Sequence, residues 1–398
     1  MKKHLPESDP ERSQARRRVI DGKQMLSTRG SKLMKYCVRS PLNLAGRIDI
    51  VMGTRPNCDY IHYLRQYGGD LLGFYPNKPL KVSLTWIQRD HKSRSADERR
   101  VKPVVVTTGE DIGIPLADSL RSKHPVPSLG MITHGWIFKR APVFEMLRPL
   151  EFVHYFCLSG TIALRLVSEY GIASHQVITT GYGVDSDFFR PPGVFEDRRL
   201  VLSAGTANRD YKTLLSAFSG LNAHLEIAAD SEWRPRPLDI AGQPLPPRVN
   251  VRSARTYNQL RRLYGSASLV VVPLYEAPFA CGYAVIAEAM AMGKAVIASR
   301  TQCHSDFILD GETGFYVGPG DVDDLRCKME YLLGNPDKAF EMGARGRSRI
   351  EQLYSLECYS ARMHVAVRSI GRNTPIDEDA IIAAQEPTLS KESAIAVL

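Results

Sequence analysis

Short apolar runs alternate with longer amphipathic stretches along the chain. In the second half, the short runs are rich in β-branched residues and apolar on both faces, which is typical of buried parallel strands. They are LVLSAG (200–205), LEIAAD (225–230), VNVRS (249–253), SLVVVP (268–273) and AVIAS (295–299). The stretches between them predict helices, such as KTLLSAFSGL (212–221) and TYNQLRRLYGSA (256–267).

The first half shows the same alternation less regularly. Its predicted strands are IDIVMG (48–53), VVVTTG (104–109) and GMITHG (130–135), and its predicted helices are PLADSLRSK (115–123) and TIALRLVSEYG (161–171). A Pro-Pro-Gly break at 191–193 separates the two halves. The pattern predicts an α/β protein with two Rossmann-like, doubly wound parallel-sheet domains that face a central cleft.

Length and composition agree with two globular domains. The chain has 398 residues, 43% of them hydrophobic and 24% charged, and one core rarely serves so long a chain. We expect residues 37–192 and 193–355 to form the two domains. The seven cysteines include no CxxC pair, the N-terminus lacks the apolar core of a signal peptide, and no apolar run is long enough to span a membrane. These features indicate a cytoplasmic protein, with neither a zinc site nor a disulfide framework.

The net charge of +9 is concentrated at the start of the chain. Residues 1–40 carry eleven Lys and Arg against four Asp and Glu, whereas residues 371–398 carry two against five. We expect a basic flexible arm over 1–36 and a disordered tail over 371–398. The arm is either simply solvated or a means of peripheral attachment to an anionic membrane through residues 1–35. Nucleic acid is not indicated, because aromatic interleaving and a binding motif are both missing.

In doubly wound sheets, ligands bind beyond the carboxyl ends of the strands. The stretch CGYAVIAEAMAMGKAVIAS (281–299) follows such an end and reads as a glycine turn, a helix and a buried strand. Backbone N–H groups of Gly282, Tyr283 and Ala284 would suit phosphate oxygens at the start of this helix. Glu288, a lone carboxylate in an apolar run, could accept two hydroxyl protons from a ribose.

Two other loops follow predicted strands in the second half. The first holds two cations, Arg209 and Lys212, which would favour an anion. The second contains Thr256 and opens the next predicted helix. We therefore expect Thr256, Gly282, Tyr283, Ala284 and Glu288 to bind a nucleotide.

Four stretches resemble family-4 retaining glycosyltransferases of the two-Rossmann (GT-B) type. They are SGTIALRLVSEYGI (159–172), GYGVDSDFFRP (181–191), and EAMAMGKAVIA (288–298) with SDFILDGETGFYVGPGDVDDL (305–325). The resemblance implies transfer of a sugar from a nucleotide diphosphate sugar to a glycolipid, polysaccharide or small-molecule acceptor. It implies retention at the anomeric carbon, no cofactor and no required metal. It also implies that a helix over 356–370 crosses back to the first domain.

The resemblance also assigns roles by position. Glu288 resembles the second glutamate of the family's E-x7-E pair, which holds the ribose, whereas the first glutamate is replaced by Ala280. Arg209, with Lys212 as neighbour or substitute, resembles the cation that neutralises the leaving diphosphate. His134 resembles the histidine that faces the donor sugar across the cleft. We therefore take His134, Arg209 and Lys212 as the candidate catalytic residues.

Each assignment has a structural alternative. His134 could be an ordinary loop histidine, Arg209 and Lys212 a solvated face, and Glu288 the partner of a buried arginine. Glu276 is either a substitute carboxylate or a surface residue. Residues 53–55 either line the cleft or form a turn, and residues 310–314 are taken as a turn without chemistry. At the level of function, the alternatives are a sugar-nucleotide epimerase and a scaffold that has lost catalysis.

Overall fold

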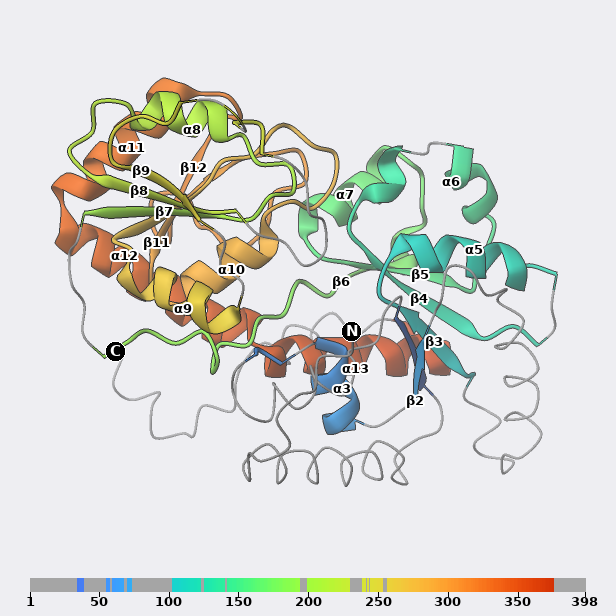
Figure 1. Ribbon diagram of the computed structural model, residues 1–398. Coiled ribbons are helices and arrows are strands. Elements are labelled where there is room, and N and C mark those ends of the chain that lie inside the picture. The colour runs from blue at the N-terminus through green and yellow to red at the C-terminus, as the bar shows by residue number, and fades with distance from the viewer. Residues whose placement is uncertain are drawn as a thin grey trace, which may run out of the picture.

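Two six-stranded parallel sheets form the protein, one in each half of the chain (Figure 1). The strand orders are β2-β1-β3-β4-β5-β6 and β12-β11-β10-β7-β8-β9, and every pair of neighbours is parallel. The computed structural model describes residues 34–38, 55–57, 59–67, 70–73, 102–122, 125–139, 142–193, 199–229, 238–240, 242, 244–252 and 256–375.

The first domain places helices on both faces of its sheet (Figure 1). Its strands are β1 (Met34–Val38), β2 (Asp70–Gly73), β3 (Val104–Thr107), β4 (Ser128–Thr133), β5 (Val153–Cys157) and β6 (Val177–Thr179). Its helices are α3 (Asp59–Tyr67), α5 (Glu110–Leu120), α6 (Pro142–Leu147) and α7 (Gly160–Ser168), with 3-10 turns η3 (Trp136–Lys139) and η4 (Ser174–Gln176).

The second domain follows the same plan. Its strands are β7 (Leu200–Ala204), β8 (His224–Ala228), β9 (Val249–Arg252), β10 (Leu269–Val272), β11 (Ala295–Ser299) and β12 (Phe315–Val317). Its helices are α8 (Tyr211–Phe218), α9 (Tyr257–Ser266), α10 (Tyr283–Ala291), α11 (Val322–Gly334), α12 (Pro336–Arg349) and the π-turn η5 (Ile350–Tyr354).

Alternation of side chains explains why the central strands are apolar throughout. Within β10, Leu269 and Val271 pack in the same core cluster as residues of α8 and α11. Val270 and Val272 belong to the other cluster, with residues of α9 and α10. Successive side chains of a strand point to opposite faces, so a strand covered by helices on both sides needs apolar residues at every position.

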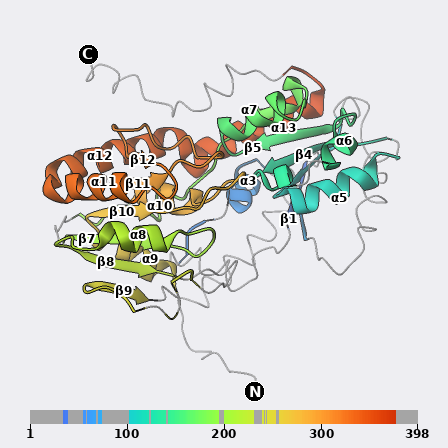
Figure 2. The same ribbon diagram turned by 90° about the horizontal axis from the view of Figure 1, so that it is seen from above.

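The last helix, α13 (Leu356–Arg372), starts in the second domain and packs on the first (Figures 1 and 2). Lys102 donates its backbone N–H to Gly371 O at 2.8 Å, and Ser128 Oγ donates to Ile370 O at 3.0 Å. The His364 ring stacks on the ring of Tyr67 in α3 at 4.0 Å between centroids. The C-terminal helix thus ties the two domains together.

The structure confirms the predicted fold class of two doubly wound parallel sheets. The predicted strand at 48–53 lies outside the described residues, as does most of each charged end. Strand β1 begins at Met34 and α13 ends at Arg372, so each element extends slightly beyond the domain limit expected from sequence. None of the helices in the described part of the chain is both long and apolar enough to cross a membrane.

Candidate active site

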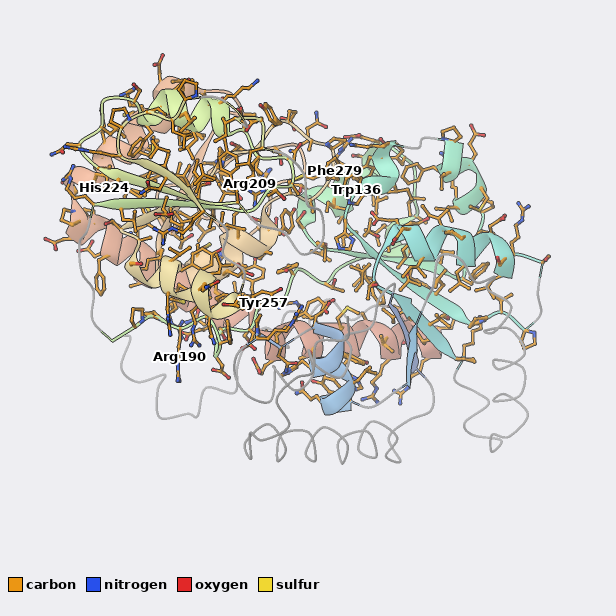
Figure 3. All side chains as sticks on the ribbon, viewed as in Figure 1. Trp136, Arg190, Arg209, His224, Tyr257 and Phe279 are labelled. Atoms are coloured by element: carbon orange, nitrogen blue, oxygen red, sulfur yellow. The ribbon has the colours of Figure 1, made fainter. Side chains whose placement is uncertain are left out.

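The carboxyl ends of both sheets lead to the junction between the domains. In the first domain, Glu110 follows β3 and His134 follows β4. In the second, Arg209 follows β7, and the loop from Leu274 to Gly282 follows β10. In Figure 3, Trp136 and Phe279 meet between the two domains, and Arg209 lies on the side of the second domain. The candidate residues therefore come together from several strand ends.

Arg209 is a buried cation, with a side chain only 6% exposed. Its Nε donates to Ala204 O at 2.8 Å and its Nη1 to Ala207 O at 2.9 Å. The loop backbone can wrap the guanidinium because Gly205 has a φ of +90°, and a Cβ there would lie 2.8 Å from Nη2. Arg209 forms no ion pair with any described residue. A buried charge without a counter-ion is costly, so this position favours an anionic ligand.

Glu288, on α10, lies near Arg209. Its Oε2 accepts a hydrogen bond from the hydroxyl of Tyr264, a buried residue of α9, at 2.9 Å. Among the described residues, nothing donates to its Oε1. Burial raises the pKa of Glu288 to about 7, although the Tyr264 hydrogen bond and the charge of Arg209 both lower it. The partner of Glu288 in the described chain is therefore a tyrosine, and one carboxylate oxygen remains open to a ligand.

Gly282 is the N-cap of helix α10 and has a φ of +74°. A Cβ at this position would lie 2.9 Å from Cγ1 of Val272, so both the backbone and the space require glycine. Ile286 N–H donates to Gly282 O at 2.9 Å, which begins the helical hydrogen bonds. The first-turn N–H groups, including those of Tyr283 and Ala284, have no acceptor within the helix. They form a positive end directly after the loop from β10.

The side chains of Tyr283 and Ala284 differ in their surroundings. Ala284 is exposed, whereas Tyr283 is buried at the domain junction. The Tyr283 hydroxyl oxygen lies 2.8–2.9 Å from Ser159 Oγ, Cys303 O and His304 O, each of which can accept its proton. Only the backbone of Tyr283 therefore remains for a ligand, and its side chain joins the second domain to the start of α7.

His134 is held by a buried carboxylate that the sequence pattern did not single out. Glu110, 3% exposed at the start of α5, accepts backbone N–H bonds on Oε1 from His134, Gly135 and Trp136 at 2.9, 2.7 and 3.1 Å. Its Oε2 lies 3.4 Å from His134 Nδ1. Burial alone would lower the pKa of His134, but the hydrogen bond and charge of Glu110 outweigh it and raise that pKa. Glu110 therefore both orients the imidazole and favours its protonation relative to a His134 without this partner.

The loop of His134 contacts the loop that replaces the expected first glutamate. Ala280 donates its N–H to His134 O at 2.6 Å. Trp136 stacks on Phe279 with ring centroids 3.9 Å apart and planes 18° apart. Lys139 Nζ lies 4.3 Å from the Phe279 centroid and 4.9 Å from that of Trp136. These contacts join the two domains beside Arg209 and Gly282.

Two predicted site residues have local structural roles. Thr256 caps α9, accepting from Gln259 N–H at 3.2 Å while the Gln259 side chain accepts from Thr256 N–H at 3.1 Å. Lys212 is exposed in the first turn of α8, where its backbone N–H approaches Asp239 Oδ2 at 3.4 Å. Its ammonium has no hydrogen bond or ion pair with the part of the chain that is described. The contacts join neither side chain to Arg209 or Glu288.

The other features noted in the sequence are structural in their contacts. Glu276 is exposed, and its Oε1 accepts the N–H groups of Ala277 and Gln302, both at 2.9 Å. Residues 310–314 form a turn closed by the Gly311 N–H to Gly314 O bond. Arg55 reaches across the junction and lies 5.0 Å from the ring centroid of Tyr257.

Sequence reasoning missed Glu110, Lys139, Phe279 and Tyr264. Glu110 and Lys139 follow predicted strands of the first half, so a search of strand ends in both halves would have found them. Phe279 and Tyr264 become significant only through contacts across elements, and no local pattern indicates these contacts.

Comparison with known proteins places these features in context. Residues 198–335 match a family model described as glycosyl transferases group 1. The chain is 26% identical over 215 residues to the MMP alpha-(1->4)-mannosyltransferase of Mycolicibacterium hassiacum, covering 52% of this chain and 51% of that protein. It is 30% identical over 233 residues to the D-inositol 3-phosphate glycosyltransferase of Gordonia bronchialis, covering 56% and 47%. The chain thus spans about half the length of these curated relatives.

Solved structures agree on the fold over most of the chain. A glycosyltransferase from Rickettsia africae aligns with a TM-score of 0.63 and 16% identity, covering 86% of this chain and 100% of that one. HepE of Anabaena, solved in complex with UDP and glucose, aligns with a TM-score of 0.61 and 13% identity, covering 85% and 100%. The protein therefore has the two-Rossmann, GT-B-like fold.

Proposed function

We propose that this protein is a family-4 retaining glycosyltransferase, which moves a sugar from a nucleoside diphosphate sugar to an acceptor. The observation that carries the proposal is the buried Arg209 guanidinium, which has no carboxylate partner in the described chain and lies near Glu288. The match of residues 198–335 to the glycosyl transferases group 1 family supports it, as does the similarity to the mannosyltransferase and the inositol phosphate glycosyltransferase named above.

In this proposal the diphosphate binds between Arg209 and the start of α10. Breaking the bond between the anomeric carbon and the β-phosphate oxygen leaves its electron pair on that oxygen. Arg209 and the first-turn N–H groups of α10 would stabilise the growing charge, because they are fixed before the reaction. Lys212 would add a weaker, solvent-screened contribution from the first turn of α8.

Glu288 would bind the ribose of the donor. Tyr264 holds one carboxylate oxygen, and the other would accept a hydroxyl proton. His134 would face the donor sugar, with Glu110 keeping the imidazole oriented and raising its pKa. Retention then requires the acceptor hydroxyl to attack the face that the diphosphate leaves, with its proton passing to the departing phosphate oxygen. No metal or cofactor enters this proposal.

The basic arm adds a separate proposal about location. The excess of Lys and Arg over residues 1–35 would attract an anionic membrane surface, where a lipid-linked acceptor could be met. Deletion of 1–35 should then abolish sedimentation with anionic vesicles, and high salt should do the same to the full chain. Equal binding of the full chain to neutral vesicles would contradict this attachment.

Incubation with labelled nucleoside diphosphate sugars, without an acceptor, tests the reaction class. The panel would contain UDP-glucose, UDP-N-acetylglucosamine, GDP-mannose and ADP-glucose. A transferase releases the nucleoside diphosphate slowly through hydrolysis, and Arg209→Ala should lose this release. Conversion of the sugar to its epimer would indicate an epimerase instead. A donor that binds but stays intact, with no transfer to any hydroxyl acceptor, would indicate a silent scaffold.

A further inference from the structure

Lys139 is a cation of the first domain whose side chain reaches Phe279 of the second domain. It is the last residue of η3, five residues after His134, and its side chain is exposed. Its ammonium forms no hydrogen bond or ion pair with the described residues. Its contacts are instead with two rings, the Trp136 ring at 4.9 Å and the Phe279 ring at 4.3 Å.

These two rings fix the ammonium at the line where the domains meet. Trp136 belongs to the first domain and Phe279 to the second, and they stack on each other between the domains (Figure 3). The bond from Ala280 N–H to His134 O, at 2.6 Å, holds the same two loops together. Because a ring face attracts a cation, Lys139 is directed toward the second domain instead of extending freely into water.

Lys139 and Arg209 act on the same place from opposite domains. Cys281 lies two residues after Phe279 and directly before Gly282, the N-cap of α10. Burial raises the pKa of Cys281 to about 11, and the charges of Arg209 and Lys139 both lower it. Two cations and a helix N-terminus thus surround one short loop.

Three carboxylates near these cations already accept hydrogen bonds within the described chain. Asp210, buried beside Arg209, accepts from Thr213 N–H and Thr213 Oγ1. Glu110 is occupied by three backbone N–H groups and His134. Glu288 is hydrogen-bonded to Tyr264, and burial favours its neutral form. Ala280 stands where the resemblance expects a glutamate. The local excess of positive charge is suited to a ligand with more than one negative charge, such as a diphosphate.

We propose that Lys139 is a second cation for the donor's diphosphate, supplied by the first domain. It would contact the anionic oxygens from the side opposite Arg209, so that the bound donor joins both domains. This inference rests on the proposed function, since it assumes that a nucleoside diphosphate binds at the junction. It assigns to Lys139 the role that the exposed Lys212 is poorly placed to fill.

Titration calorimetry with Lys139→Met tests the inference, with UDP, GDP and ADP as probes and the corresponding nucleosides for comparison. Methionine keeps an apolar stem against the two rings but removes the charge. Lys328→Met is the matched control, because Lys328 also lies over a ring, that of Phe315 at 4.8 Å, but on α11. A third variant, Lys139→Arg, keeps the charge.

We expect Lys139→Met to weaken nucleoside diphosphate binding at least about tenfold, in the range for loss of a charged hydrogen bond. Nucleoside binding should change little, Lys139→Arg should restore most of the affinity, and Lys328→Met should match the wild type. Equal diphosphate affinity of Lys139→Met and wild type would overturn the inference. Equal weakening of diphosphate and nucleoside would also overturn it, by indicating a structural role. If the wild type binds none of the three diphosphates, the proposed function itself fails.

Discussion

Glu110→Gln is the change that most directly tests how His134 is held. The substitution keeps the size of the side chain and an oxygen that can accept the N–H groups of residues 134–136. It removes the negative charge and places an amide N–H₂ or oxygen where Oε2 now lies 3.4 Å from His134 Nδ1. The variant therefore separates the charge of Glu110 from its shape.

The expected loss of stability follows from the three backbone N–H bonds to Glu110 Oε1, at 2.7–3.1 Å. A hydrogen bond to a charged group contributes about 1.5–3 kcal/mol and a neutral one about 0.5–1.5 kcal/mol, so three weakened bonds cost roughly 3 kcal/mol. A buried neutral amide has a smaller desolvation cost than a buried carboxylate, which offsets part of this loss of stability. We expect the free energy of unfolding to fall by about 1–3 kcal/mol.

The pKa of His134 should fall in the same variant. In the wild type burial lowers this pKa, and Glu110 outweighs burial with smaller help from the charges of Asp59 and Asp111. Removal of the Glu110 charge takes away the largest raising effect. A raised folded-state pKa gives stability that is fully present below the unfolded value of about 6.5 and is lost as pH rises through the folded value. The wild type should therefore exceed Glu110→Gln in stability by more at pH 6 than at pH 8.

Histidine NMR titration and urea unfolding at the two pH values measure both effects. Glu151→Gln is the matched control, because Glu151 forms an exposed pair with His175 at 3.1 Å, and exposed pairs contribute little. If His134 titrated at the same pH in wild type and Glu110→Gln, the proposed electrostatic link between the two residues would be wrong.

Three further predictions concern the second domain. Gly282→Ala should destabilise the protein by about 2–4 kcal/mol in urea unfolding, since the positive φ and the crowded Cβ position both oppose a side chain. A smaller loss than about 0.5 kcal/mol would contradict that geometry. Nucleoside diphosphate affinity of the wild type should rise from pH 6 to pH 8 relative to that of Glu288→Gln. The reason is that the pKa of Glu288 is raised to about 7 and its ionised form is the better hydroxyl acceptor. Arg209→Ala should lower kcat about a hundredfold to a thousandfold and change KM less, whereas Lys212→Ala should cost less. Transfer at the wild-type rate by both variants would place the diphosphate elsewhere.

The elements that sequence predicted best are the buried strands of the second half. LVLSAG, LEIAAD, VNVRS, SLVVVP and AVIAS correspond to β7, β8, β9, β10 and β11, within a residue or two at their ends. Strands β7, β8, β10 and β11 are almost wholly buried, so their apolar composition is a direct consequence of their position. Strand β9 lies at the edge of the sheet with only Val249 buried, so the predicted burial of VNVRS is wrong. The helix from Tyr283 to Ala291 was likewise predicted from a glycine start and a glycine stop.

The first half was harder to predict for physical reasons. Strand β5, VHYFC, contains His154 and two aromatic residues in place of a β-branched run, and β6 has only three residues. Helix α5 begins at Glu110, five residues before the predicted start at Pro115, because the helix accommodates this proline in its interior. At each of these places, tertiary packing determines the secondary structure against the preference of the local sequence.

The site shows the same division between local and tertiary information. Arg209, Gly282 and Glu288 follow from the rule of strand ends and from the cost of a buried charge, so sequence could identify them. The partner of Glu288 could not be read, because Tyr264 meets it from another helix. Lys139 and Phe279 come together only when the two domains are in contact, and no sequence period encodes that contact.

Titration calorimetry of Glu288→Gln with UDP, GDP and ADP tests the central claim, that the junction binds the nucleotide of a sugar donor. Wild type should bind at least one of these diphosphates, and Glu288→Gln should keep the fold but lose about 1.5–3 kcal/mol of binding free energy, the range for a charged hydrogen bond. Glu330→Gln, an exposed change on α11, should bind as wild type does. An unchanged Kd in Glu288→Gln, or no binding of any diphosphate by the wild type, would contradict the account.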